Sequence, residues 1–158
     1  MAFRPPAALW AVLLAPFVGL AAILVEYLTG ILLLYLRTRK LVTRATVHGS
    51  YAVAAQVEVL DIVSVLAVVV GEELILRQLL FRLLAGDLAL ALWAVIPLCA
   101  VAYAANHLSF GLASAIAKLP SGLLYVLLFY VSGLSVLVVV IAHATQNLTL
   151  LAWWRLRS

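Results

Sequence analysis

One segment of this 158-residue chain places charged side chains where a continuous hydrocarbon surface would be expected. It reads GEELILRQLLF over residues 71–81 and contains Glu72, Glu73 and Arg77. Ionisable groups within membrane segments are costly, and they usually face a bundle interior or a hydrated cavity where they serve a pathway or a catalytic centre. The segment is therefore the first candidate for the functional site.

The composition predicts an integral membrane protein. Hydrophobic residues make up 68% of the chain, charged residues only 10%, and the mean hydropathy is +1.24. This length leaves room for five or six helical spans of roughly 20 residues each. We expect an all-α polytopic transmembrane helix bundle with about five membrane segments, forming a single integral membrane domain over residues 1–158. The lone cysteine, Cys99, is expected to serve packing.

Five apolar segments are expected, and their flanking charges predict an orientation. The segments are about 7–36, 51–85, 88–107, 123–131 and 134–154, with breaks at Gly86-Asp87 and at Lys118, Pro120 and Ser121. Basic residues cluster after the first segment and at the C-terminus, including Arg155 and Arg157. By the positive-inside rule both clusters face the cytoplasm, which an odd number of spans allows. The net charge of +4 is thus explained by topology, and no nucleic-acid binding is expected.

The first segment allows a competing interpretation as a cleaved signal peptide, but its apolar run is too long for one. Pro16 and Gly19 predict a kink in this helix. Glu26 lies too deep for an ordinary lipid-facing residue. At 100° per residue, Glu58, Asp61 and Glu72 fall within roughly 60° of one another, which predicts one hydrated helix face.

Polar residues on later segments can meet Glu72. Counted from Gly86-Asp87, Glu72 lies about 21 Å along one helix and His107 about 30 Å along the next, so both reach the cytoplasmic half of the bilayer. His143 and Asn147 are spaced i, i+4 and share one face of the last helix. Three helices can therefore bring these four side chains together at one site.

These residue types support hydrolysis of an amide bond. Arg77 follows Glu73 at i+4, so it can neutralise that carboxylate and leave Glu72 to act separately. Glu72 with His107 could take a proton from a water molecule, while His143 and Asn147 bind that water or a developing oxyanion. Such a mechanism needs no covalent intermediate.

The sequence resembles the CPBP intramembrane proteases, a family that includes the eukaryotic prenyl-protein CAAX endopeptidase and many bacterial members. The resemblance rests on three motifs. Glu-Glu-x-x-x-Arg stands at 72–77, Phe-x-x-x-His appears with Tyr as Tyr103 to His107, and His-x-x-x-Asn runs from His143 to Asn147. Two positions depart from the usual pattern: Tyr103 replaces Phe, and Gln78 stands where Gly is common.

The resemblance implies a glutamic-type intramembrane protease with its catalytic core at about 51–154. Glu72 would be the general base acting on water with His107, while His143 and Asn147 orient the water or stabilise the oxyanion. Glu73, Arg77 and Tyr103 would be supporting residues. The expected partners are the lipid bilayer and a membrane-tethered or lipidated peptide. A CAAX-type prenylated tail, a secreted peptide leader and a C-terminal sorting segment all fit, in the plasma (inner) membrane of a prokaryote.

No metal or other cofactor is expected, because the chain has no His-Glu-x-x-His motif and no cysteine pair. The metal-assisted alternative would place zinc on Glu72, His107 and His143.

Two other interpretations of the function stay open. Ser132-Gly133 partly matches a serine protease signature with His143 as its base, although only 11 residues separate Ser132 from His143. A proton-coupled carrier or a non-catalytic membrane binding or immunity protein would use the acidic face of Glu58, Asp61 and Glu72 as a relay. The chain shows no internal repeat of the kind that transporters carry.

Overall fold

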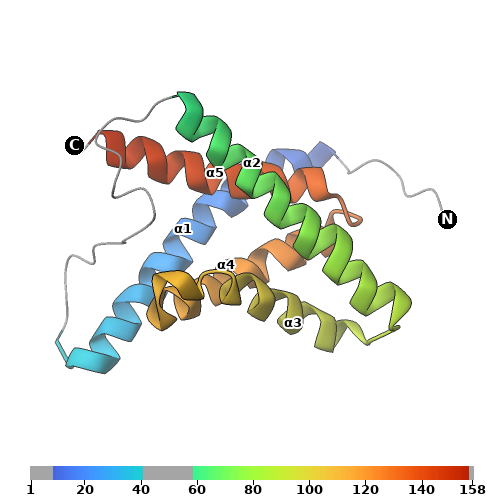
Figure 1. Cartoon of the computed structure of the whole chain (residues 1–158), viewed down its shortest axis with the longest axis horizontal. Coiled ribbons are helices and arrows are strands. Elements are labelled where there is room, and N and C mark those ends of the chain that lie inside the picture. The colour runs from blue at the N-terminus through green and yellow to red at the C-terminus, as the bar shows by residue number, and fades with distance from the viewer. Residues whose placement is uncertain (1–8, 41–58, 157–158) are drawn as a thin grey trace.

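The computed structural model describes residues 9–40 and 59–156, and every regular element within these ranges is helical (Figure 1). The α-helices are α1 (Leu9–Thr38), α2 (Val59–Glu73), α3 (Leu92–Ala105), α4 (Leu112–Val131) and α5 (Val136–Arg155). Two π-helical segments, η2 (Leu74–Leu80) and η3 (Leu83–Asp87), extend α2, and the short 3-10 helix η4 (Leu108–Phe110) precedes α4. The predicted all-α bundle is confirmed.

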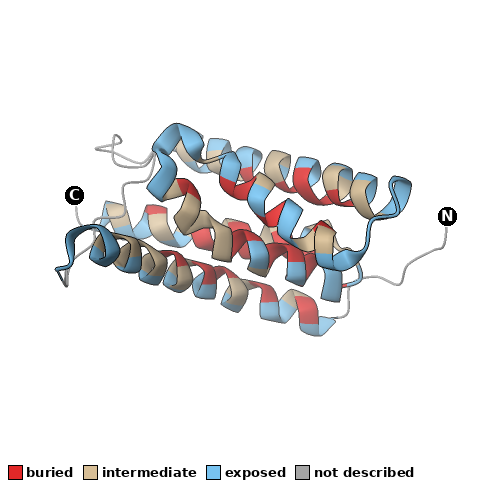
Figure 2. Ribbon diagram, turned by 90° about the horizontal axis from the view of Figure 1, so that it is seen from below, coloured by how far each residue is buried: buried red, intermediate tan, exposed pale blue. Residues whose placement is uncertain are grey.

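The outer surface of the bundle is apolar. Figure 2 shows buried residues on the inward faces of the helices and exposed residues on their outer faces and ends. Large side chains among the exposed residues include Leu13, Phe17 and Trp93, whose exposed fractions are 63%, 67% and 81%. By length and composition α1, α4 and α5 can each cross a membrane, and α3 is a shorter apolar helix. Such a surface suits lipid rather than water, so the chain forms a polytopic membrane bundle.

The first helix packs against two other helices along one face and is otherwise mostly exposed. α1 contacts both α4 and α5, while α3 packs on α4 and α2 packs on α5 (Figure 1). α1 and α5 approach closely at Gly19, where an added Cβ would lie 2.2 Å from the carbonyl oxygen of Ala142. Small residues allow helix backbones to approach in this way in membranes. α1 continues through Pro16 as one helix.

The predicted break at Lys118, Pro120 and Ser121 is wrong. α4 starts at Leu112 and runs through all three residues, so it begins well before the expected segment at 123. Two contacts make these residues acceptable within the helix. The Ser121 hydroxyl donates to the carbonyl oxygen of Lys118 at 3.0 Å, and the Lys118 ammonium lies 2.9 Å from Oε2 of Glu26 on α1. Serine side chains and neighbouring helices commonly compensate for proline in membrane helices.

The third segment is shorter than expected. Its helix begins at Leu92 instead of Leu88, because the backbone is extended at Ala91, where ψ is 143°. It ends at Ala105, so His107 lies in the turn before η4 and not on the helix itself. The depth estimated for His107 assumed a regular helix over the whole segment, and that assumption does not hold. Glu58 and Arg157 lie outside the described residues, and Asp61 is partly buried on α2.

Candidate active site

The two adjacent glutamates at the junction of α2 and η2 lie in different environments. Glu73 is fully buried, while the Glu72 side chain is 18% exposed. Successive residues on a helix point in different directions, so only Glu72 is open to an incoming molecule. The junction is also where regular α-helix gives way to the wider π-helix, a change that often accompanies functional sites.

Glu73 holds two partners, one on each carboxylate oxygen. Oε2 lies 3.2 Å from Nε of Arg77, so the ion pair expected from the i, i+4 spacing is present. Oε1 lies 2.8 Å from Nδ1 of His143 on α5. Because a carboxylate can only accept here, Nδ1 of His143 is the donor. Glu73 therefore joins the π-helical segment to α5 at the centre of the bundle.

Arg77 is fully buried, and none of its three guanidinium nitrogens makes a hydrogen bond to a described residue. Its 3.2 Å contact with Glu73 is therefore an ion pair without hydrogen-bond geometry. The guanidinium carbon lies 5.6 Å from the centroid of the Tyr103 ring, within the range of a cation–π contact. The charge of Arg77 is thus offset by one carboxylate and one aromatic face.

Glu72 contacts the site through both oxygens. Oε1 accepts a hydrogen bond of 2.6 Å from Nδ2 of Asn106, and Oε2 lies 3.8 Å from Nε2 of His143. Asn106 was missed by sequence reasoning, although it stands directly before His107 at the end of an apolar segment. A polar residue in that position was the available signal.

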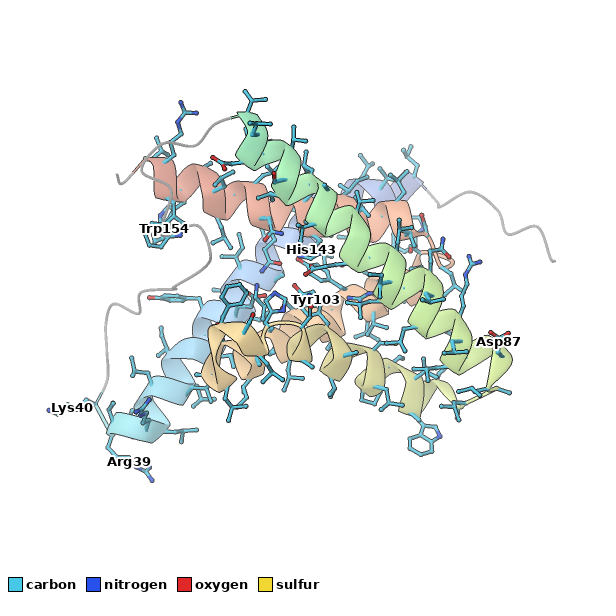
Figure 3. All side chains as sticks on the ribbon, viewed as in Figure 1. Arg39, Lys40, Asp87, Tyr103, His143 and Trp154 are labelled. Carbon is cyan, nitrogen blue, oxygen red and sulfur yellow. The ribbon has the colours of Figure 1, made fainter. Side chains whose placement is uncertain are left out.

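His143 lies at the centre of the site, with 2% of its surface exposed. Its Nδ1 donates to Glu73, and its Nε2 faces both Glu72 Oε2 and the Tyr103 hydroxyl, which is 3.4 Å away. Figure 3 shows the labelled side chains of Tyr103 and His143 close together in the interior of the bundle. The ring of Tyr125 lies at 5.1 Å from the imidazole with a tilt of 31°.

His107 is fixed by its own backbone. Its Nδ1 lies 3.0 Å from the carbonyl oxygen of Tyr103 and must donate to it, which leaves Nε2 of the neutral ring as an acceptor. The Tyr103 ring contacts both imidazoles, at 5.1 Å from His107 and 5.7 Å from His143. The structure therefore brings Glu72 directly to His143 and places His107 on the partly exposed side of Tyr103.

Asn147 lies one helical turn after His143, is partly buried, and makes no side-chain hydrogen bond to another described residue. Gln146, next to it, was not predicted. Gln146 is fully buried and accepts a hydrogen bond from the Tyr125 hydroxyl. A second polar residue beside the motif asparagine was the only sign of it in the sequence.

The predicted zinc alternative and the serine alternative find no support in these contacts. Across residues 9–40 and 59–156, no three His, Cys, Asp or Glu side chains are grouped closely enough to hold a metal ion. Glu72, His107 and His143 therefore do not form such a group in this part of the chain. The Ser132 hydroxyl is buried at the end of α4, where it donates to the carbonyl oxygen of Phe129 at 3.1 Å.

Comparison with known families identifies the chain. The family model described as type II CAAX prenyl endopeptidase Rce1-like matches residues 56–149, which is more than half of the chain and includes all three motifs. No curated protein and no solved structure shows significant similarity to the sequence. The match confirms the resemblance to CAAX-type membrane proteases that the motifs indicated. The chain therefore belongs to the Rce1-like family of type II CAAX prenyl endopeptidases.

Proposed function

We propose that this protein is an intramembrane endopeptidase that hydrolyses a peptide bond of a membrane-associated or lipid-modified protein, using water activated by Glu72 and His107. One observation carries the proposal. Of the two adjacent carboxylates, Glu73 is sequestered by Arg77 and His143, while Glu72 is partly exposed and has one oxygen directed toward an imidazole. A carboxylate in that situation can accept a proton.

The geometry around Glu72 suits a bound water molecule. The attacking water is proposed to lie about 2.8 Å from Glu72 Oε2, beside the 3.8 Å gap between this oxygen and His143 Nε2. Glu72 takes the proton of this water as its oxygen attacks the carbonyl carbon of the substrate. His107, whose Nε2 is its unengaged nitrogen, assists by accepting the second hydrogen of the water. The proton held by Glu72 then passes to the amine nitrogen as the carbon–nitrogen bond breaks.

Asn147 is proposed to stabilise the tetrahedral intermediate, and His143 to position the attacking water. Asn147 has an amide that is not used by other described side chains, and its NH₂ can donate to an oxyanion. His143 is held in place by Glu73, which Arg77 holds in turn. The imidazole is therefore fixed beside Glu72 before the substrate binds.

The proposed setting is a lipid bilayer. We propose a single membrane domain over residues 1–158 with its catalytic core at about 51–154, in the plasma membrane of a prokaryote with the C-terminus cytoplasmic. The substrate is a membrane-tethered peptide of one of three kinds: a CAAX-type prenylated tail, a secreted peptide leader or a C-terminal sorting segment. The family match supports the first of these.

A cleavage assay on detergent-purified protein tests the proposal. The substrates are a library of membrane-tethered peptides of the three kinds, and metal analysis accompanies the assay. We expect Glu72→Gln to lower kcat by about 10²- to 10⁴-fold, the usual contribution of a general base, and His143→Ala to abolish cleavage. Asp87→Asn, at an exposed carboxylate at the end of η3, is the matched control and should retain activity. Full cleavage activity in both Glu72→Gln and His143→Ala would refute the proposed mechanism.

The rival functions give different results in the same preparation. A serine mechanism predicts that Ser132→Ala loses cleavage activity while Glu72→Gln retains it, which is the reverse of our expectation. A proton-coupled carrier predicts proton flux in vesicles that depends on Glu72 and Asp61, with no peptide cleaved under any condition.

A further inference from the structure

The hydroxyl of Tyr103 is a group that the family motif does not require. This side chain is fully buried, and its hydroxyl oxygen lies 3.4 Å from Nε2 of His143. A phenylalanine at this position, the usual residue in the motif, would fill the same space without that contact. Burying a hydroxyl without a hydrogen-bond partner is unfavourable, so its placement against one particular nitrogen calls for a physical reason.

The other contacts of His143 supply the reason. Nδ1 must carry a proton because it faces the Glu73 carboxylate. In the neutral imidazole Nε2 is then a bare acceptor, and the Glu72 oxygen 3.8 Å away cannot donate to it as a carboxylate. Among the described side chains within reach of Nε2, only the Tyr103 hydroxyl can donate to it. A buried acceptor left without a donor typically costs about 1–3 kcal/mol.

We propose that Tyr103 is a positioning residue whose hydroxyl bonds Nε2 of His143 and holds the imidazole in line between Glu73 and Glu72. The inference rests on the proposed function of the site. A hydroxyl can both donate and accept, so it keeps its contact with Nε2 whether or not that nitrogen carries a proton during turnover. The imidazole is thereby hydrogen-bonded at both nitrogens, to Glu73 through Nδ1 and to Tyr103 through Nε2.

Gly122 and Tyr125 on α4 support this placement of the tyrosine. A Cβ at Gly122 would lie 2.8 Å from Cδ1 of Tyr103, so α4 packs directly against the ring. The ring of Tyr125 meets that of Tyr103 edge-on, with centroids 5.9 Å apart. The backbone carbonyl of Tyr103 also accepts from His107. The hydroxyl is therefore held on a rigid side chain.

The test compares Tyr103→Phe with Tyr125→Phe. Both remove one buried hydroxyl and keep the ring, but the Tyr125 hydroxyl bonds Gln146 and neither imidazole. We expect Tyr103→Phe to lower kcat by about fivefold to tenfold, as loss of one hydrogen bond to a reacting group does, with KM within about twofold. Tyr125→Phe should change kcat by less than about twofold. Equal losses of kcat in the two variants, or a loss confined to thermal stability, would overturn the assignment.

A spectroscopic measurement keeps this test independent of protease activity. The chain has three histidines, so ring nitrogen resonances in ¹⁵N-histidine-labelled protein can be assigned with His143→Ala. Tyr103→Phe should shift the Nε2 resonance of His143 and leave its Nδ1 resonance, bonded to Glu73, nearly unchanged. An unmoved Nε2 resonance refutes the positioning role. If the wild-type protein cleaves no peptide but the Nε2 shift is seen, the proposed function fails and the contact stands.

Discussion

Nδ1 of His143 lies 2.8 Å from Oε1 of Glu73, a residue 70 positions earlier in the chain. The same carboxylate forms an ion pair with Arg77 through its other oxygen. The sequence assigned Glu73 to a supporting pair with Arg77 alone, and the tertiary structure adds the imidazole. Glu73 is thus the residue that connects the buried charge of Arg77 to the centre of the proposed site.

Removing Arg77 should destabilise the protein more than removing the whole ion pair. Arg77→Met leaves the Glu73 carboxylate fully buried with only His143 beside it, and breaking a buried pair in this way costs about 3–5 kcal/mol. The double variant Glu73→Gln/Arg77→Met removes both charges and should recover most of that stability without recovering cleavage. Thermal unfolding in detergent and the peptide assay measure the two effects. A double variant less stable than Arg77→Met would contradict the prediction.

Asn106 should matter for the reaction and little for stability. Its side chain is exposed, and Nδ2 donates to Oε1 of Glu72 at 2.6 Å. Asn106→Ala leaves this carboxylate oxygen free to rotate away from His143, so we expect kcat/KM to fall about tenfold, equivalent to about 1.4 kcal/mol. The melting temperature should stay within a few degrees. Unchanged kinetics would show that the hydrogen bond does not orient Glu72.

A methyl group at Gly19 should disturb the active site from outside the matched family region. The added Cβ would lie 2.2 Å from the Ala142 carbonyl oxygen, next to His143, so α1 and α5 must move apart. We expect Gly19→Ala to destabilise by about 1–3 kcal/mol, as overpacking does, and to reduce cleavage. Gly30→Ala, on the same helix with nothing within 4 Å of its Cβ, is the control and should be neutral or slightly stabilising. Similar behaviour of the two variants would argue against close packing at Gly19.

The Glu26–Lys118 pair should join α1 to the rest of the bundle. Glu26 is 9% exposed, and the Oε2–Nζ distance to Lys118 is 2.9 Å. Lys118→Met leaves a nearly buried carboxylate without its cation, so the protein should unfold at a lower temperature than the wild type. Glu26→Gln/Lys118→Met, which removes both charges, should be more stable than Lys118→Met alone. The reverse order of melting temperatures would rule out the ion pair.

Much of the site could be predicted because its residues obey local spacing. The i, i+4 intervals place Glu73 with Arg77 and His143 with Asn147 in any helix, and polar side chains in apolar segments are conspicuous. Asn106, Gln146 and Tyr125 could not be assigned partners, because their contacts join residues of different helices. The break expected at Pro120 failed for a similar reason. A distant residue, Glu26, neutralises Lys118 within α4.

The sequence alone determined that this chain is a helical membrane bundle and which ionisable residues its interior must accommodate, since hydropathy and helical period depend only on local residue order. Only the tertiary structure decided how the roles of two adjacent glutamates differ. Glu73 turns into the core toward Arg77 and His143, and Glu72 stays partly exposed beside Asn106. That division depends on which helices pack together. The spacing of residues within one segment does not show which distant segment it packs against.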